Sequence, residues 1–124
     1  MENLLIASTK RTPEVSFSTD GRLKISGRSI PEDPTQFYDK LFEWVFYYCQ
    51  EPNPTTTIDI ILEYFNSGSS KAILEILRAL VDTAKKGKQI SINWYYEEGD
   101  DDILERGEYY ESILDVKFNF IETE

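Results

Sequence analysis

The residues best suited to chemistry lie in one short polar run that separates two apolar segments. This run consists of Asn66, Ser67, Gly68, Ser69, Ser70 and Lys71. The β-branched segment 57–65 before it is expected to form a central strand, and a helix is expected to begin near Ser69 or Ser70. Ligands and partners often dock where a strand of an α/β sheet leads into a helix, because free N–H groups there favour an anion.

Three interpretations of this run follow from the residues alone. Ser67 or Ser69 could act only as a helix cap, with its hydroxyl accepting a bond from a free N–H group. Alternatively, a serine could accept a regulatory phosphate, or the turn could bind the phosphate of a ligand. The phosphate loop of nucleotide-binding proteins is not matched, since Gly68 has no partner glycine before Lys71 and no hydroxyl residue follows the lysine.

Composition excludes several kinds of catalytic and metal site. The chain has no histidine and a single cysteine, Cys49, so it lacks the Ser-His-Asp and Cys-His nucleophile systems and the ligands for zinc. The acidic run 97–102 does not follow the spacing of a calcium loop and is expected to be a solvated helix start. We therefore predict no enzyme activity, no cofactor and no metal ion.

Charge narrows the class of partner. Thirteen basic and twenty-three acidic residues give a net charge of −10, which repels nucleic acid and anionic lipid at long range. No segment approaches the roughly 20 apolar residues needed to cross a bilayer, and residues 1–6 lack the features of a secretory signal. With a single cysteine, these features predict a cytoplasmic protein that binds neither nucleic acid nor membranes.

Hydrophobic periodicity predicts the order of the elements. Residues 1–12 show no period and are expected to be a loose arm of a single domain spanning 1–124. Alternation on either side of the turn Asp20-Gly21 predicts an antiparallel hairpin over 14–27. The remaining elements are expected as helices over about 34–50, 69–86 and 100–111, and as strands over 57–65, 89–96 and 116–120.

The strand 89–96 indicates the architecture, because its two faces differ. Its apolar residues alternate with Gln89, Ser91 and Asn93, so one face of the sheet is expected to meet water. Helices on both faces would require continuous apolar strands. We therefore expect a two-layer α/β domain. Its mixed sheet has about five strands, built from the N-terminal hairpin and parallel strand–helix–strand units, with about three helices mainly on one face.

Aromatic doublets recur along the chain and suggest where side chains meet the surface. They are Tyr47-Tyr48, Tyr95-Tyr96 and Tyr109-Tyr110. Exposed aromatic residues are common at protein interfaces, whereas half-buried ones complete the edge of a core. The sequence leaves both roles open.

Several short blocks also resemble a known family. They are Thr12-Pro13-Glu14, Gly27–Glu32, Leu62–Asn66, Ser69-Ser70-Lys71 and Asn93–Glu98. On these blocks the chain resembles the SiaC-type family of bacterial regulatory phosphoproteins, small domains similar to the STAS fold of anti-sigma-factor antagonists. The likeness runs through nearly the whole chain and implies a STAS-like regulatory domain.

The resemblance implies a signalling role. Ser67 holds the place of the family's phosphoacceptor threonine. A dedicated Ser/Thr kinase with a histidine-kinase-like ATPase fold would phosphorylate it, and a metal-dependent Ser/Thr phosphatase would restore it. In its unphosphorylated form the protein would bind and activate a diguanylate cyclase, raising cyclic di-GMP and promoting biofilm formation. The chain would thus switch between partners and never act as a catalyst.

The polar run departs from the family at two positions. The family's usual Asn-Thr-Ser-Ser-Ser-Lys becomes Asn-Ser-Gly-Ser-Ser-Lys, so the expected acceptor is Ser67, with Ser69 as a competitor. Gly68 is expected to loosen the turn, because glycine accepts a wider range of backbone conformations. The expected switch turn and partner-binding residues are Asn66, Gly68, Ser69, Ser70 and Lys71.

Overall fold

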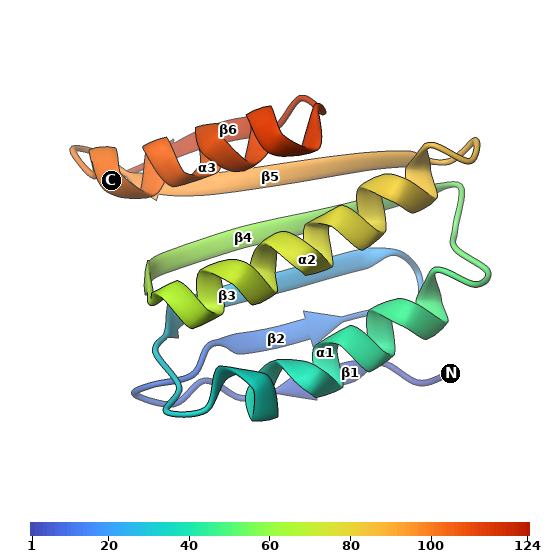
Figure 1. Cartoon of the computed structure of the whole chain (residues 1–124), viewed down its shortest axis with the longest axis horizontal. Helices are drawn as coiled ribbons and strands as arrows, with labels where there is room; N and C mark the ends of the chain where they lie inside the picture. The colour runs from blue at the N-terminus through green and yellow to red at the C-terminus, as the bar shows by residue number, and fades with distance from the viewer.

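The computed structural model describes all 124 residues as three helices packed on a six-stranded sheet (Figure 1). The strands are β1 (Leu4–Ile6), β2 (Glu14–Phe17), β3 (Arg22–Ser29), β4 (Thr55–Phe65), β5 (Gln89–Glu97) and β6 (Asn119–Thr123). The helices are α1 (Pro34–Tyr48), α2 (Ser67–Ala84) and α3 (Asp101–Leu114). This arrangement confirms the predicted α/β class, with a mixed sheet and three helices.

The strands follow one another across the sheet in chain order, from β1 at one edge to β6 at the other. The pairs β1–β2 and β2–β3 are antiparallel, and every pair from β3 to β6 is parallel. The β2–β3 pair is the predicted hairpin, and one helix connects the two strands of each parallel pair.

The sheet has one strand more than predicted, because part of the expected loose arm is ordered. Leu4–Ile6 forms β1, in which Ile6 pairs with Val15. Just before this strand, the indole Nε1 of Trp44 donates to the carbonyl oxygen of Glu2 at 2.8 Å. Three residues are too few for a periodic signal, and the contacts that hold them come from residues distant in sequence.

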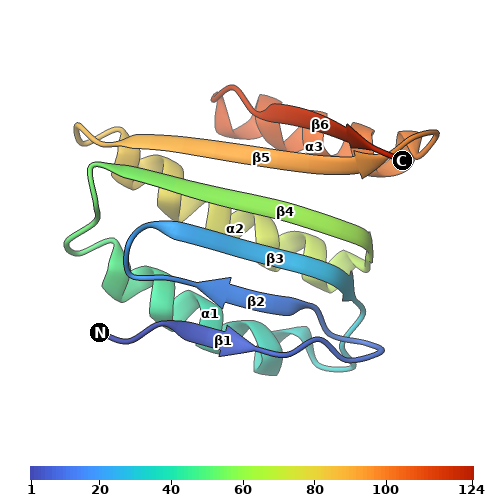
Figure 2. The same ribbon diagram turned by 180° about the vertical axis from the view of Figure 1, so that it is seen from behind.

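All three helices cover one face of the sheet, as the views from opposite sides show (Figure 1, Figure 2). The other face carries a ladder of polar side chains. Asn93 Nδ2 donates to Asp59 Oδ1 at 2.8 Å, and Asn119 Nδ2 donates to Asn93 Oδ1 at 2.9 Å. The two-layer arrangement predicted from the polar face of β5 is therefore confirmed.

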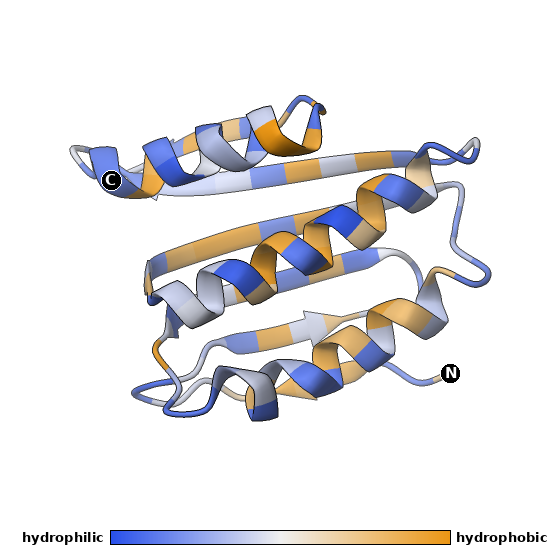
Figure 3. Ribbon diagram, in the orientation of Figure 1, coloured by the Kyte–Doolittle hydropathy of each residue, from blue (hydrophilic) through white to orange (hydrophobic).

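Trp94 on β5 organises the packing of α3 against the sheet. Its side chain is fully buried, and its Nε1 donates to the carbonyl oxygen of Ile103 at 2.9 Å. A Cβ on Gly107 would lie 2.6 Å from this Nε1, so a glycine is required where α3 crosses the indole. Figure 3 shows how hydropathy is distributed over the other elements. Apolar residues follow one another along β4, and apolar and polar residues alternate along α2.

The starts of α1 and α3 agree with prediction. Asp33 Oδ1 accepts a hydrogen bond from Gln36 N at 3.1 Å, with Pro34 in the first helical position. Asp100 Oδ1 likewise accepts from Ile103 N at 3.1 Å. In both helices a carboxylate satisfies an N–H group that the helix itself leaves free.

Candidate functional site

The polar run joins the end of β4 to the start of α2, the position predicted for it. The helix starts at Ser67, two to three residues earlier than expected. Its cap is Asn66, whose Oδ1 accepts from Ser69 N at 2.9 Å and whose carbonyl oxygen accepts from Ser70 N at 2.8 Å. Of the three interpretations of the run, the one in which Ser67 or Ser69 caps the helix is wrong, because the Asn66 side chain already accepts from the N–H group concerned.

The hydroxyl of Ser67 is the free one among the three serines. Ser67 is the first residue of α2, its side chain is exposed, and no hydrogen bond ties its hydroxyl to another side chain. Its neighbour Lys71, one helical turn later, is also exposed. Residues four apart lie on the same side of a helix, so a positive charge lies near this hydroxyl.

Ser69 is fully buried and belongs to a chain of hydroxyl groups between β3, α1 and α2. Its Oγ donates to the carbonyl oxygen of Ser29 at 3.0 Å and accepts from Ser29 Oγ at 2.8 Å. Because the Ser29 proton is used in this bond, the Tyr38 hydroxyl donates to Ser29 Oγ, at 2.6 Å. Burial raises the pKa of Tyr38 to about 12, and the contacts with the Ser29 and Ser69 hydroxyls oppose this rise only in part.

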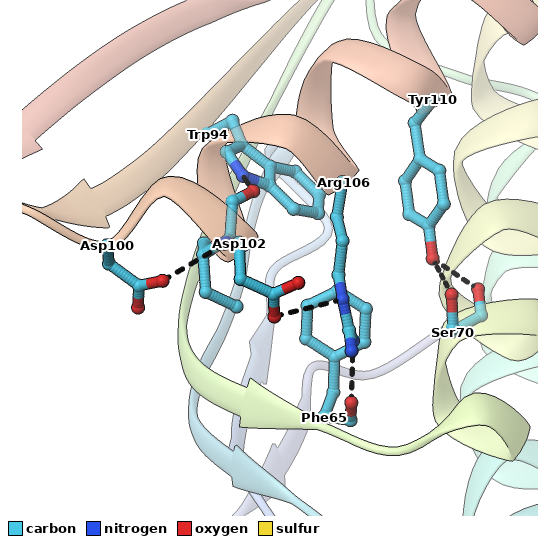
Figure 4. A network of polar contacts seen from close by, with 8 residues as sticks. Phe65, Ser70, Trp94, Asp100, Asp102, Arg106 and Tyr110 are labelled. Atoms are coloured by element: carbon cyan, nitrogen blue, oxygen red, sulfur yellow. Dashed lines mark hydrogen bonds and ion pairs between the residues drawn. The ribbon is translucent and has the colours of Figure 1, made fainter.

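The third serine is held by α3 (Figure 4). The Tyr110 hydroxyl donates to the carbonyl oxygen of Ser70 at 2.7 Å and is also hydrogen-bonded to Ser70 Oγ. Burial raises the pKa of the Tyr110 phenol, which favours the protonated form that donates this bond. The first turn of α2 is thus fixed on one side by α3.

Arg106, one turn earlier on α3, fixes the end of β4 (Figure 4). Its Nη1 donates to the carbonyl oxygen of Phe65 at 2.7 Å, and its guanidinium lies 4.5 Å from the centre of the Phe65 ring. Its Nε lies 3.4 Å from Asp102 Oδ2. The residue immediately before the helix cap is therefore held by a cation as well as by the sheet.

Gly68 lies against α1 and makes the turn tighter instead of looser. A Cβ on Gly68 would lie 2.6 Å from Pro34 Cγ, and the glycine has no positive φ. Its role is thus a close approach between two helix starts, not the conformational freedom that the sequence suggested. Beside this contact, a groove of about 210 Å³ runs between α1 and α2. Its lining includes Gly68, Lys71, Asp39, Phe42 and Glu75.

The surroundings of Ser67 contain few polar contacts. No side chain is hydrogen-bonded to the Ser67 hydroxyl, which meets solvent. No group of three or more His, Cys, Asp or Glu side chains is close enough to hold a metal ion, and none of the helices is long and apolar enough to span a bilayer.

Sequence reasoning missed the residues that hold the turn from outside. These are Ser29, Pro34, Tyr38, Arg106 and Tyr110, which come from β3, α1 and α3. The tyrosine doublets in the sequence were the one feature that could have pointed to Tyr110. In two of them one ring is exposed while the next is buried, as Tyr109 and Tyr110 show. A doublet on an amphipathic helix thus predicts one tyrosine with a structural role and one on the surface.

Comparison with known proteins identifies the family. A family model described as SiaC family regulatory phosphoprotein matches residues 6–123. The chain belongs to the SiaC family. The matched region contains the polar run, both elements that it joins and every residue that fixes it from outside, so the whole site lies within the part of the chain that the family shares.

Individual relatives and solved structures are similar to this chain over nearly its full length. An uncharacterized protein of Pseudomonas aeruginosa strain UCBPP-PA14 is 28% identical over 121 residues, covering 97% of this chain and 94% of the relative. The crystal structure of apo-SiaC from P. aeruginosa matches with a TM-score of 0.86 at 27% identity, over 100% of each chain. The crystal structure of the diguanylate cyclase SiaD in complex with its activator SiaC from P. aeruginosa matches with a TM-score of 0.90 at 26% identity, over 97% of this chain and 99% of the matched chain.

Proposed function

We propose that this SiaC-family chain is a non-enzymatic partner switch set by reversible phosphorylation of Ser67. The observation that carries the proposal is the contrast among the serines of one turn. The Ser67 hydroxyl is exposed and free, whereas Ser69 is buried against Ser29 and Ser70 is bonded to Tyr110. A kinase can reach Ser67 without opening the fold, while phosphorylation of Ser69 would require α2 to leave Ser29. This favours Ser67 over its competitor.

The catalytic groups for both steps would come from partner enzymes. In the forward step Ser67 Oγ attacks the γ-phosphorus of ATP, its proton leaves with the kinase base, and ADP departs. In the reverse step a phosphatase transfers the phosphoryl group to water and the serine hydroxyl is restored. A kinase with a histidine-kinase-like ATPase fold and a metal-dependent Ser/Thr phosphatase suit these roles, as the family resemblance implies. A kinase that uses ATP would suit a switch located in the cytoplasm.

The phosphate would change a surface more than it changes the fold. It adds about −1.5 to −2 charges at the first residue of α2, where the positive end of the helix dipole tolerates an anion. The adjoining residue Gly68 lines the groove between α1 and α2. A partner held in that groove would therefore meet a new, strongly hydrated charge at its edge, which favours its release.

The proposed effector is a diguanylate cyclase. The support is the likeness, at 26% identity and a TM-score of 0.90, to a chain in the structure of SiaD with its activator SiaC. By this likeness the unphosphorylated form of our chain would bind and activate such a cyclase, raising cyclic di-GMP and promoting biofilm formation. Phosphate on Ser67 would then break the complex.

The test starts from protein isolated from its native cells. Phosphosite mass spectrometry with and without phosphatase treatment is expected to find removable phosphate on Ser67. Affinity purification with Ser67→Ala and Ser67→Asp should then retain the cyclase on the alanine variant and lose it on the aspartate variant. The matched control is Ser112→Asp, which adds the same charge at another exposed serine and should retain the cyclase.

Two outcomes would contradict the proposal. One is the absence of phosphate on Ser67 across growth conditions, together with identical partners for both Ser67 variants. The other is saturable binding of a phosphate-bearing metabolite that depends on Ser67 and needs no protein partner. The second outcome would make the turn a ligand site, the alternative that the sequence left open.

A further inference from the structure

A second surface, at the opposite end of the helical layer from the start of α2, has the shape of a docking site. It is a groove of about 600 Å³ between the N-terminal segment and the C-terminal half of α1. Figure 1 shows this end of α1 beside the N-terminus, whereas α2 starts at the other end of the strands. The apolar lining includes Leu4, Trp44 and Tyr47.

The aromatic residues of this groove are presented on a fixed scaffold. Trp44 stacks on Tyr48 with ring centroids 5.2 Å apart, and its Nε1 is bonded to the backbone of Glu2. Tyr47 in contrast is 59% exposed, and the neighbouring Phe46 is 62% exposed. Exposed aromatic rings such as that of Tyr47 are typical of residues that anchor a protein partner, and their faces attract arginine and lysine.

The margin of the groove carries more acidic than basic groups. Its margin carries the carboxylates of Glu2, Glu43 and Glu51 against two cations, the Lys40 ammonium and the α-amino group of Met1, and all five residues are exposed. None of these glutamates takes part in an ion pair. The negative end of the α1 dipole points to the same region, and the last turn of α1 has no basic residue.

We propose that this groove binds a short basic and apolar segment of a partner protein. An arginine or lysine of that segment lies over Tyr47 and among the glutamates, and an adjacent aliphatic side chain packs against Leu4 and Trp44. Charge complementarity selects this occupant. A second copy of the chain, itself at −10, would bring like charges together, and anionic lipid or nucleic acid is repelled in the same way. The proposal does not depend on phosphorylation of Ser67.

The first experiment titrates the full chain with the peptide Ac-Arg-Leu-Arg-Leu-Arg-Leu-NH₂ at about 150 mM salt, followed by NMR of backbone and indole N–H groups. Saturable shifts at the Trp44 indole and along the second half of α1 are expected. Tyr47→Ala should weaken binding at least tenfold. Tyr109→Ala, which removes a ring of similar exposure on α3, should change it less than twofold. Ser67→Asp should bind as the unchanged protein does.

A charge-matched pair of variants separates a defined site from general attraction to an acidic protein. The triple variant Glu2→Gln, Glu43→Gln and Glu51→Gln should weaken binding at least tenfold. The control Glu98→Gln, Glu105→Gln and Glu108→Gln, which has the same net charge, should weaken it less than threefold. Equal losses in the two triple variants would overturn the proposal. It would also fail if N-acetyl-arginine amide bound as tightly as the peptide, since the groove would then hold a small cation instead of a protein segment.

Discussion

A Cβ atom on Gly68 would lie 2.6 Å from Cγ of Pro34. Gly68 is the second residue of α2 and Pro34 is the first residue of α1, so this contact sets how closely the two helix starts approach. Any residue with a Cβ atom at this place would require the starts of the two helices to move apart. The proposed acceptor Ser67 is therefore positioned partly by a contact with a residue outside its own helix.

Substitution of Gly68 tests this contact. Gly68→Ala should destabilise the protein by about 1–3 kcal/mol through overpacking, offset by up to about 1 kcal/mol from better helix propensity. Pro34→Ala removes the crowded ring atoms, so the double variant should be more stable than the sum of the single effects predicts. Urea unfolding of the four proteins measures this coupling, and additive effects would contradict the proposed contact.

Removal of the hydroxyl group is expected to change the stability of the protein by different amounts at Ser67 and Ser69. Ser69→Ala removes the group that joins both oxygens of Ser29 and leaves a buried carbonyl without that bond, so a loss of about 1–3 kcal/mol is expected. Ser67→Ala should change stability by less than about 0.5 kcal/mol, as for an ordinary surface site. Equal losses of stability in urea unfolding would contradict the different roles of a buried, bonded Ser69 and an exposed Ser67.

Tyr38 gives the protein a characteristic weakness at high pH. Its pKa of about 12 in the folded state lies above the ordinary value near 10, so the unfolded chain releases this proton first as the pH rises. Stability should be fully present below pH 10 and fall by up to about 3 kcal/mol toward pH 12. Urea unfolding between pH 9 and 12 should show this slope, and Tyr38→Phe should make it shallower.

A conservative change at an exposed tyrosine serves as the control for this slope. Tyr47→Phe removes a phenol that lies on the surface, so the loss of stability at high pH should persist unchanged. Tyr110 shifts in the same direction as Tyr38, also by burial, which means that Tyr38→Phe should reduce the slope without abolishing it. A slope that is unaffected by Tyr38→Phe would show that the buried hydroxyl chain does not control the alkaline transition.

Local sequence patterns predicted most of the fold, because the strands and helices of its parallel units have regular hydrophobic periodicity and clear start residues. Asp33 and Pro34 marked the start of α1 by their residue types, and the alternation in 89–96 indicated which face of the sheet is polar. β1 was not predicted, because a strand of three residues is too short to show a hydrophobic period. It is held instead by Val15 and Trp44, which lie far from it in sequence.

The sequence predicted where the candidate site lies but not what each of its residues does. The polar run was located correctly, yet the capping role was considered only for a serine, whereas Asn66 caps the helix. The roles of Ser69 and Gly68 depend on Ser29 and Pro34, about forty and thirty-four residues earlier in the chain. No local pattern encodes which of several adjacent serines faces the core, since that depends on how three separate elements meet.

The effect of charge at Ser67 on stability separates two ways in which a phosphate could act. Ser67 lies at the positive end of α2, while Ser112 lies in the last turn of α3. Ser67→Asp should be more stable than its neutral reference Ser67→Asn by about 0.3–1 kcal/mol. Ser112→Asp should be less stable than Ser112→Asn by a similar amount. Urea unfolding at low and high salt measures both differences, which should shrink together as salt screens the charges.

A stable Ser67→Asp variant that loses its partner would mean that the charge acts on the interface itself. This is expected from the contacts of the turn, because none of the hydrogen bonds that hold Asn66, Ser69 and Ser70 involves the Ser67 side chain. If Ser67→Asp instead lost more than about 1 kcal/mol relative to Ser67→Asn, the anion would be melting the first turn of α2. Partner release would then follow from disorder, and amide hydrogen exchange at Ser69 and Ser70 would rise in that variant alone.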